Sequence, residues 1–235
     1  MPKIKSSSEY LMPAEWERQK STWIAWPHNK SDWPSKFQKI PTVFLDIIFH
    51  LSSDQIINIL VQRQAQKKII KKNLKLRKTK MGNIRFYLIK NNRAWIRDYG
   101  PIFVKNKLGK KLILNWKFNA WAKYKDYQKD DRVNHFISKK FKRKIIEPKY
   151  KKKQIVLEGG AIDVNGNGTL ITTRECLLSK VQERNPGFSA KVYEKVFDKY
   201  LGVKNVIWLN KGLVGDDTHG HIDDVAKFVS ENKIF

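Results

Sequence analysis

Residues 156–173 read VLEGGAIDVNGNGTLITT, and this stretch decides the fold class. Its β-branched, apolar runs flank Asn165-Gly166-Asn167-Gly168, a tetrapeptide typical of a tight turn between antiparallel strands. Glu158 and two glycines follow the first apolar pair, where a buried strand is expected to end. The stretch therefore predicts a strand that stops at a polar turn, followed by a β-hairpin.

Strands and helices alternate on both sides of this hairpin. Apolar runs predict strands over residues 22–26, 55–61, 84–89, 102–105, 111–118, 205–209 and 225–229. Helical spacing predicts helices after Pro41, over 64–76, 130–141 and 189–201, with Gly202 as the stop of the last one. The pattern contains no repeat at the level of residues and no linker. We therefore predict a mixed α/β fold and a single domain over residues 1–235.

The charge is extreme, at a formal net +26. A basic surface for nucleic acid or an anionic membrane is one interpretation. The other is a lysine-rich composition that fills solvent-facing positions. The basic runs, at residues 67–75, 139–144 and 149–153, are not interleaved with aromatic residues as in a nucleic-acid-binding module. We favour the second interpretation and do not expect a nucleic-acid partner.

The sequence also predicts the compartment. A hydrophobic fraction of 41% is enough for a sizeable core, and the single cysteine, Cys176, leaves no intrachain disulfide. The N-terminal residues MPKIKSSSEYLMPAEW contain no apolar stretch of signal-peptide length, and no run approaches the roughly 20 apolar residues that cross a bilayer. We therefore expect a cytoplasmic protein with no membrane partner.

Two polar motifs stand where strands are expected to end. The first is Trp95-Ile96-Arg97-Asp98-Tyr99-Gly100-Pro101, where a carboxylate could be held before a rigid turn for ligand binding, or Arg97 and Asp98 could brace the turn as a pair. The second is Glu158-Gly159-Gly160, where the glycines allow the backbone to approach a ligand or to turn sharply. An ordinary turn with a solvated Glu158 is the alternative.

A third motif is DDTHGHIDD, residues 216–224. Two histidines and four aspartates in nine residues favour a metal site or acid–base chemistry, against a plain polar loop. In an extended segment, His221 and Asp223 would point to the same face. Cys176 has no histidine beside it in sequence, and we interpret it as a small buried hydrophobe.

Together and in this order, the motifs resemble the agmatine deiminase and bacterial-type peptidylarginine deiminase family. The matching segments are Met12 to Trp16, Trp23 to Pro27, Trp95 to Pro101, Asn115 to Trp121, Glu158 to Gly160, Thr172 to Leu178, Arg184 to Pro186 and His219 to Asp223. One departure is Trp121-Ala122-Lys123-Tyr124, where the family usually has W-G-G-K-Y.

The resemblance implies a five-bladed α/β propeller with pseudo-fivefold ββαβ units, a pentein fold, which this chain would form incompletely. It implies hydrolysis of a guanidinium to a ureido group and ammonia without a cofactor or metal. Asp98 and Asp223 would bind the guanidinium nitrogens, and Trp95 would form an apolar wall beside the substrate. His221 would transfer protons, and Glu158 would orient it.

The resemblance also implies a cysteine nucleophile in a C-terminal glycine-rich segment with His-Cys, which residues 1–235 do not contain. Cys176 stands at a different, non-nucleophilic position of the family. We therefore expect this chain to be inactive alone. It could be a fragment, one half of a split enzyme completed by a second chain, or a pseudoenzyme.

For the complete protein we expect conversion of agmatine to N-carbamoylputrescine and ammonia, in putrescine biosynthesis. Peptidylarginine deiminase-like activity, or a non-catalytic basic protein that binds nucleic acid or anionic surfaces, is the alternative. The expected partners are agmatine and either a second copy of the chain or a complementing C-terminal chain.

Overall fold

The computed structural model describes residues 9–235. Residues 1–8, the start of the polar N-terminal stretch, lie outside the described part. The chain divides into two compact units. The first comprises residues up to 17, 97–125 and 134–235, and the second comprises residues 18–96 and 126–133. The single domain over residues 1–235 stays a prediction.

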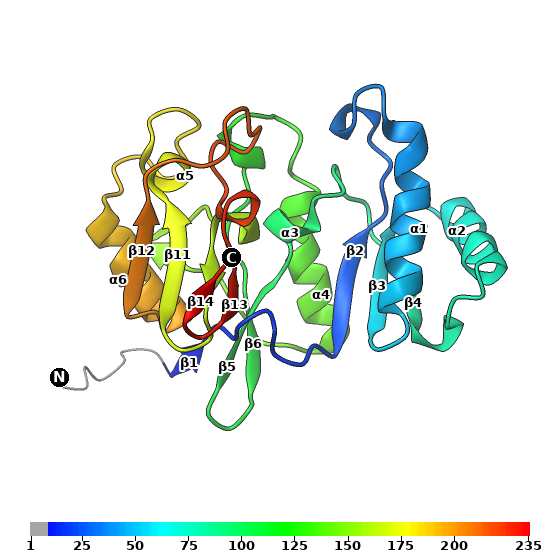
Figure 1. The fold of residues 1–235 in the computed structure, drawn as a ribbon, viewed down its shortest axis with the longest axis horizontal. Helices are drawn as coiled ribbons and strands as arrows, with labels where there is room; N and C mark the ends of the chain where they lie inside the picture. The colour runs from blue at the N-terminus through cyan, green and yellow to red at the C-terminus, as the bar shows by residue number, and fades with distance from the viewer. Residues whose placement is uncertain (1–8) are drawn as a thin grey trace. The chain divides into compact units, whose positions relative to one another are not determined.

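The second unit is a three-stranded parallel sheet with two helices, drawn in blue and cyan in Figure 1. Its elements are β2 (Ser21–Ala25), α1 (Ile40–Leu51), β3 (Ile56–Val61), α2 (Gln64–Leu76) and β4 (Ile84–Leu88). The strands lie in the order β2-β3-β4, as expected when each helix crosses over to a neighbouring parallel strand. All five elements were predicted from the sequence to within two residues.

The core of this unit explains why these segments form these elements. The central strand β3 is an almost continuous apolar run, as in strands covered on both faces. In α1, Leu45 and Ile48 are three residues apart, and in α2, Ile70 and Leu74 are four residues apart. Each pair therefore lies on one face of its helix. These residues form one buried cluster with the sheet.

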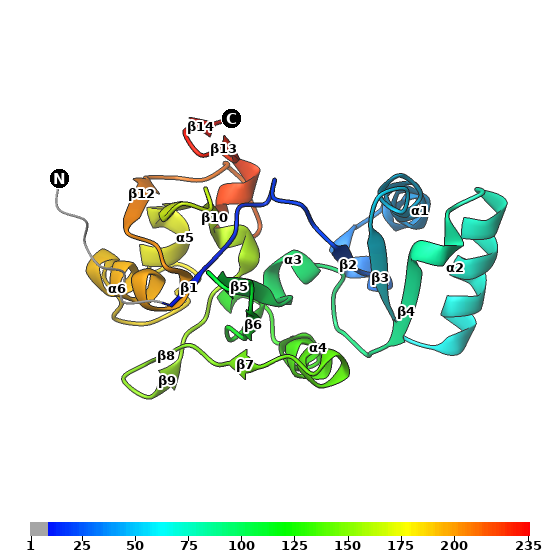
Figure 2. The same ribbon diagram turned by 90° about the horizontal axis from the view of Figure 1, so that it is seen from below.

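The first unit holds two further sheets. One has the order β1 (Tyr10–Leu11), β5 (Ile102–Asn106), β6 (Lys111–Leu114) and β7 (Ile145–Ile146). The other has the order β10 (Asp163–Val164), β11 (Thr169–Thr173) and β12 (Asn205–Leu209). Two small hairpins, β8 (Lys149–Tyr150) with β9 (Lys153–Gln154) and β13 (Phe228–Ser230) with β14 (Lys233–Ile234), are visible in Figure 2. The helices that complete the list are α3 (Ile96–Tyr99), α4 (Val133–Phe141), α5 (Arg174–Leu178) and α6 (Ala190–Leu201).

The predicted hairpin is confirmed. β10 and β11 pair in antiparallel fashion, with Asp163 opposite Ile171. The Asn165 side chain accepts hydrogen bonds from the N–H groups of Asn167 and Thr169, and Gly166 has a φ of 71°. A side-chain-bonded Asn and a left-handed glycine are what a turn of this kind requires.

Three sequence predictions are corrected. The strand over 111–118 ends at Leu114, because its pairing with β5 ends at Ile102, directly after Pro101. The strand over 225–229 begins only at Phe228. Residues 95–101 do not end a strand but form the helical turn α3, which sends neighbouring side chains in different directions.

The largest buried cluster of the described residues lies in the first unit, where apolar residues of its two sheets pack against α6. Tyr193 and Phe197 of α6 pack there, fully buried, with Leu114 and Leu170. Among residues 9–235, no helix has the length and apolar character to cross a membrane.

Candidate functional site

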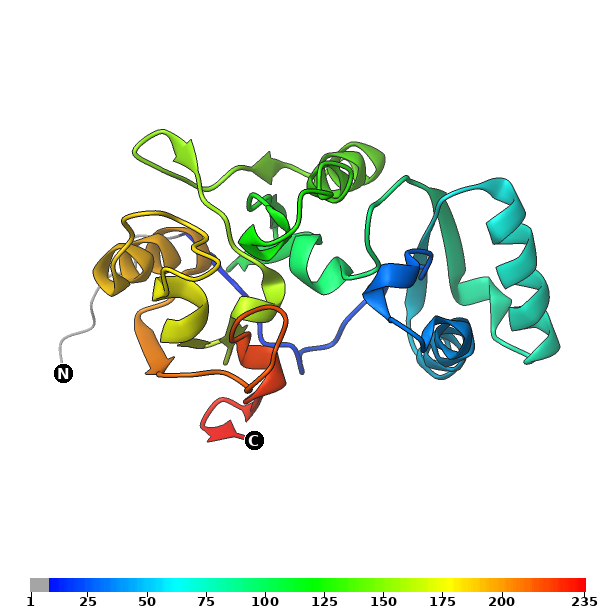
Figure 3. The ribbon, with the colours of Figure 1, turned by 90° about the horizontal axis from the view of Figure 1, so that it is seen from above.

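Polar residues from distant parts of the sequence meet in the first unit. Asp98 lies on α3, Glu158 precedes the short turn Gly159–Ala161, and His221 and Asp223 lie at the short turn Ile222–Asp224. The segments that carry them are drawn in green, yellow-green and red in Figure 3. The four residues predicted to be catalytic are thus brought together.

His221 is at the centre of this group. Its Nδ1 lies 3.7 Å from Asp98 Oδ1 and 3.8 Å from Asp223 Oδ1, and its Nε2 lies 3.9 Å from Glu158 Oε2. These separations are ion-pair distances and too long for hydrogen bonds. His221 Nε2 and Glu158 Oε2 are both buried without a hydrogen-bond partner among the described residues. The three carboxylates therefore surround one imidazole at ion-pair distance.

Gly160 forms part of the wall of this group. A Cβ on Gly160 would come within 2.5 Å of His221 Nδ1, 2.7 Å of Asp98 Oδ1 and 2.9 Å of Asp223 Oδ2. The Gly160 N–H donates to Asp98 Oδ1 at 3.1 Å. The sharp turn predicted at the glycine pair is present as the short turn Gly159–Ala161, and a side chain at Gly160 would collide with the acids and the imidazole. Approach of the backbone to a ligand stays a prediction.

Arg184 balances the buried charge of Glu158. Its Nε donates to Glu158 Oε1 at 3.1 Å, and neither side chain is exposed to solvent. The rest of the guanidinium donates to the backbone oxygens of Gln182 and Thr218. Burial alone would raise the pKa of Glu158, but Arg184 and His221 outweigh burial and lower it to about 2. The alternative of a solvated Glu158 is therefore wrong.

The acids in turn hold His221 in its charged form. Burial lowers the pKa of an imidazole, but the charge of Asp98 and the contacts with Cys176 and Glu158 outweigh burial. The pKa of His221 is raised well above its ordinary value. When all groups are ionised, three carboxylates (Asp98, Asp223 and Glu158) and two cations (His221 and Arg184) give the site one net negative charge.

The pKa values of Asp98 and Asp223 are raised, whereas that of Glu158 is lowered. Burial raises the pKa of Asp98, an effect that the His221 charge opposes and the Glu158 charge reinforces. Burial, opposed by His221, raises the pKa of Asp223 to about 6. Asp223 keeps 29% side-chain exposure against 8% for Asp98, so the group opens to solvent on the Asp223 side.

Asp216 shapes the loop that carries His221. Its carboxylate accepts hydrogen bonds from the backbone N–H groups of Thr218, Gly220 and His221. The backbone then enters the turn Ile222–Asp224, so the predicted extended segment is wrong. His221 and Asp223 nevertheless come together, because the short turn carries the Asp223 carboxylate back to the imidazole.

The contacts of Arg97 and Trp95 bear on the predictions for the segment Trp95 to Pro101. Arg97 does not brace the turn with Asp98 but forms an ion pair with Glu15. Trp95 belongs to the second unit, where its ring centroid lies 5.1 Å from that of Trp33 and the residue is 39% exposed. Its role as a wall for substrate stays a prediction.

Cys176 is buried, as the sequence predicted, at 1% exposure. Burial raises the pKa of its thiol. Glu158, Cys176 and His221 each offer one ligand atom, and these three atoms lie within 4.8 Å of one another. The Arg184 guanidinium bonded to the same Glu158 would repel a dication placed there. The arrangement suits a proton better than a metal ion.

Two members of the site were missed as functional residues. Arg184 lies in the matching segment Arg184 to Pro186, which gave no role for it. Trp121 lies in an aromatic segment, and its Nε1 donates to Asp98 Oδ2 at 3.0 Å. Both act across more than 20 residues of sequence, and a local pattern carries no sign of such partners.

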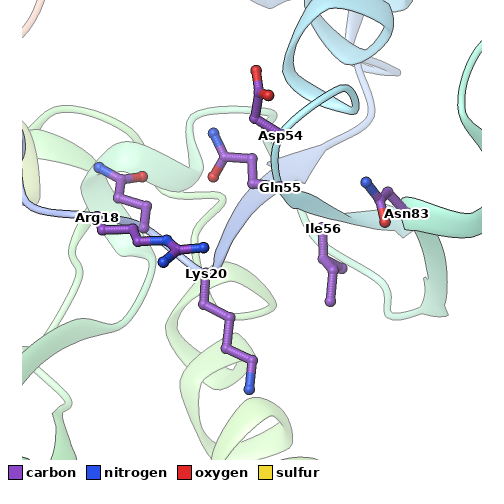
Figure 4. Close-up of a pocket in the computed structure, with 7 residues that line it drawn as sticks. Arg18, Lys20, Asp54, Gln55, Ile56 and Asn83 are labelled. Carbon is purple, nitrogen blue, oxygen red and sulfur yellow. The ribbon is translucent and has the colours of Figure 1, made fainter.

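The second unit has a solvent-facing hollow of about 410 Å³. Its lining residues, drawn in Figure 4, are Arg18, Gln19, Lys20, Asp54, Gln55, Ile56 and Asn83. Arg18, Lys20 and Asp54 are exposed, so their charges are hydrated. The hollow offers none of the buried charge found in the first unit.

Comparison with known proteins places this geometry in context. Residues 11–235 match the family described as Porphyromonas-type peptidyl-arginine deiminase. The chain is 34% identical over 234 residues to the agmatine deiminase of Pseudomonas aeruginosa, a match that covers 96% of this chain and 59% of the relative.

Solved structures give the same result. The agmatine deiminase of Enterococcus faecalis is similar with a TM-score of 0.84 and 33% identity, over 96% of this chain and 60% of that one. A C. jejuni agmatine deiminase with substrate bound has a TM-score of 0.82 and 30% identity, over 96% and 63%. The predicted mixed α/β fold is confirmed, and the chain spans about 60% of the length of these relatives.

Proposed function

Because the chain belongs to the Porphyromonas-type peptidyl-arginine deiminase family, we propose that its first unit binds the guanidinium group of a small substrate. The observation that carries this is the buried group of three carboxylates around His221, with the Arg184 guanidinium bonded to Glu158. Its single net negative charge is matched by one guanidinium cation.

We assign the acids that face the opening to binding. A guanidinium is a planar fork of N–H donors, which carboxylates accept in pairs. Asp98 and Asp223 both face the Cα of Gly160 and would bind the nitrogens of the guanidinium. The role of Trp95 as an apolar wall beside the substrate stays a prediction from the family resemblance.

We assign proton transfer to His221 and Glu158. The charged imidazole would give a proton to the leaving ammonia and take one from the attacking water. Glu158, kept ionised by Arg184, holds His221 charged and fixes its orientation. Cys176 is not assigned as the nucleophile, because burial raises the pKa of its thiol.

For the complete protein we propose hydrolysis of agmatine to N-carbamoylputrescine and ammonia, a step toward putrescine. The names of the relatives support agmatine. Because the chain spans about 60% of their length, we assign guanidinium binding to this chain and turnover to the whole protein. We also propose that residues 1–235 form a single domain, an incomplete five-bladed α/β propeller. A crystal structure of the whole protein would test this proposal.

Calorimetric titration of the chain with agmatine tests guanidinium binding. We expect one site per chain and an affinity at least tenfold lower in Asp98→Asn, which keeps the shape and removes the charge. Asp46→Ala, at an exposed ion pair in the second unit, is the matched control and should bind as wild type does. Equal affinity in Asp98→Asn and wild type would contradict the assignment.

Competition separates the substrates. Agmatine should displace a fluorescent guanidine more effectively than free arginine or an N-acyl arginine amide, each used as competitor. Preference for the N-acyl arginine amide would instead favour peptidylarginine deiminase-like activity.

A second candidate function is binding of an anionic surface through α2. Lys68, Lys71, Lys72 and Lys75 are exposed along this helix, and Ile69 beside them is 63% exposed. Binding of this kind falls steeply with added salt. The variant Lys68→Glu/Lys72→Glu should abolish retention on anionic vesicles or RNA if the candidate is correct, and equal retention of variant and wild type would exclude it.

A further inference from the structure

Residues Ala120, Trp121 and Ala122 form an unusual turn in the first unit. Their φ angles are 51°, 59° and 54°, the left-handed region that L residues with a Cβ rarely enter. Three such residues in succession without a glycine persist only where the surroundings impose them. Ala120 and Trp121 are also buried.

Several hydrogen bonds impose this turn. The Asn119 side chain accepts from the Ala122 N–H at 2.9 Å, and the N–H groups of Lys123 and Tyr124 donate to the Ala120 oxygen. Gln182 Nε2 donates to the Trp121 oxygen at 3.0 Å. The backbone around Trp121 is therefore held on both sides, and its side chain has a fixed direction.

That direction is toward Asp98. The indole N–H of Trp121 donates to Asp98 Oδ2 at 3.0 Å, while the Gly160 N–H donates to Oδ1 at 3.1 Å. Each carboxylate oxygen thus has one donor, which fixes the plane of the carboxylate. The Phe118 ring meets the Trp121 ring edge-on at 5.3 Å and limits its rotation.

We propose, on the basis of the guanidinium site proposed above, that Trp121 is a positioning residue. Its N–H orients the Asp98 carboxylate and favours its ionised form for the substrate cation, and the left-handed turn aims the indole. A hydrogen bond to the charged form of an acid favours that form. The other groups that influence Asp98 are His221, Glu158, the Gly160 N–H, Asp223 and Arg97.

The chain offers a matched control. Trp116 is also buried, at 4% exposure, and its indole nitrogen has no hydrogen-bond partner among the described residues. Trp116→Phe removes an indole from the same unit without removing a donor from an acid. Trp121→Phe removes the donor to Asp98. Replacement of Trp121 by benzothienylalanine removes only the N–H and keeps the bicyclic shape, so it tests the donor even if Trp121→Phe folds poorly.

The test is agmatine affinity as a function of pH, measured by calorimetry on the chain. Loss of the indole N–H raises the pKa of Asp98, so both Trp121 variants should bind about tenfold more weakly at pH 6 and recover at pH 8.5. The midpoint of their pH profiles should move upward. Trp116→Phe should keep the wild-type profile.

Four outcomes separate the assignments. A wild-type profile in the benzothienylalanine variant overturns the positioning role, and so does an equal shift in Trp116→Phe. If Asp98→Asn lowers affinity while the Trp121 variants behave as wild type, only the positioning role fails. If Asp98→Asn has no effect, the guanidinium site itself is wrong.

Discussion

Each unit contains a carboxylic acid with no solvent exposure, Glu158 in the first and Asp130 in the second, and the two acids differ in charge. Glu158 has a guanidinium bonded to it, and its pKa is lowered to about 2. Asp130 accepts from the N–H groups of Asn92 and Arg93, and burial raises its pKa to about 7. The guanidinium bonded to Glu158 thus outweighs the burial that dominates at Asp130.

The same contrast separates the two arginine networks. In the second unit, Arg93 joins Asp32 at 2.7 Å and Asp126 at 2.9 Å, which ties loops together. In the first unit, Arg184 bonds one oxygen of Glu158 and leaves the other facing His221 at 3.9 Å. A charged acid with one free oxygen beside an imidazole is equipped for proton transfer.

The largest expected effect comes from removal of the cation that distinguishes the two acids. Arg184→Met leaves the Glu158 charge buried without a partner, and should lower the free energy of unfolding by about 3–5 kcal/mol at pH 7. Because Glu158 can take up a proton, the deficit should shrink in acid. Urea unfolding at pH 7 and pH 4 measures both effects. Recovery of stability in Arg184→Met/Glu158→Gln is the control, and no recovery would contradict the pairing.

Asp130 should show the opposite pH dependence. Its folded-state pKa of about 7 lies above the ordinary value of 3.8, so the folded state binds the extra proton and stability falls as pH rises from about 4 to 7. Asp130→Asn keeps the acceptor oxygen and loses the ionisation. The variant should be more stable than wild type at pH 8, by at most about 4 kcal/mol, and similar at pH 4. Equal stability at pH 8 would show that Asp130 is not neutralised by burial.

Gly160→Ala tests whether the space between the acids is the binding space. The new Cβ would meet three site atoms at under 3.0 Å, so agmatine binding should be lost while stability falls by about 1–3 kcal/mol. Gly82→Ala in the second unit, with no atom within 4 Å of the new Cβ, is the matched control. Retained affinity in Gly160→Ala would place the ligand elsewhere.

Much of this was predictable from local pattern. The sheet of the second unit follows from runs such as residues 55–61, and α6 from its spacing and the Gly202 stop, which has a φ of 71°. The site acids could be selected from the polar motifs that carry them, although Asp98 lies in the helical turn α3 and not at the end of a strand. The strand over 111–118 was predicted too long, because its end depends on a partner strand that begins at Ile102, and the partners Arg184 and Trp121 depend equally on long-range contacts.

The smallest expected effect concerns the left-handed turn. Ala122→Gly removes a Cβ from a residue with a φ of 54° and should raise the free energy of unfolding by about 1 kcal/mol. Ala65→Gly, within helix α2, should lower it by a similar amount. A lower melting temperature in Ala122→Gly would argue against strain at this turn.

The measurement that tests the guanidinium site most directly is the affinity of the wild-type chain for agmatine between pH 5 and pH 7.5. Asp223 has a pKa of about 6 and binds the cation only when ionised, and the pKa of Asp98 is also raised. The affinity should therefore rise about tenfold across this range. An affinity that stays constant or falls over the same range would contradict binding by these two acids.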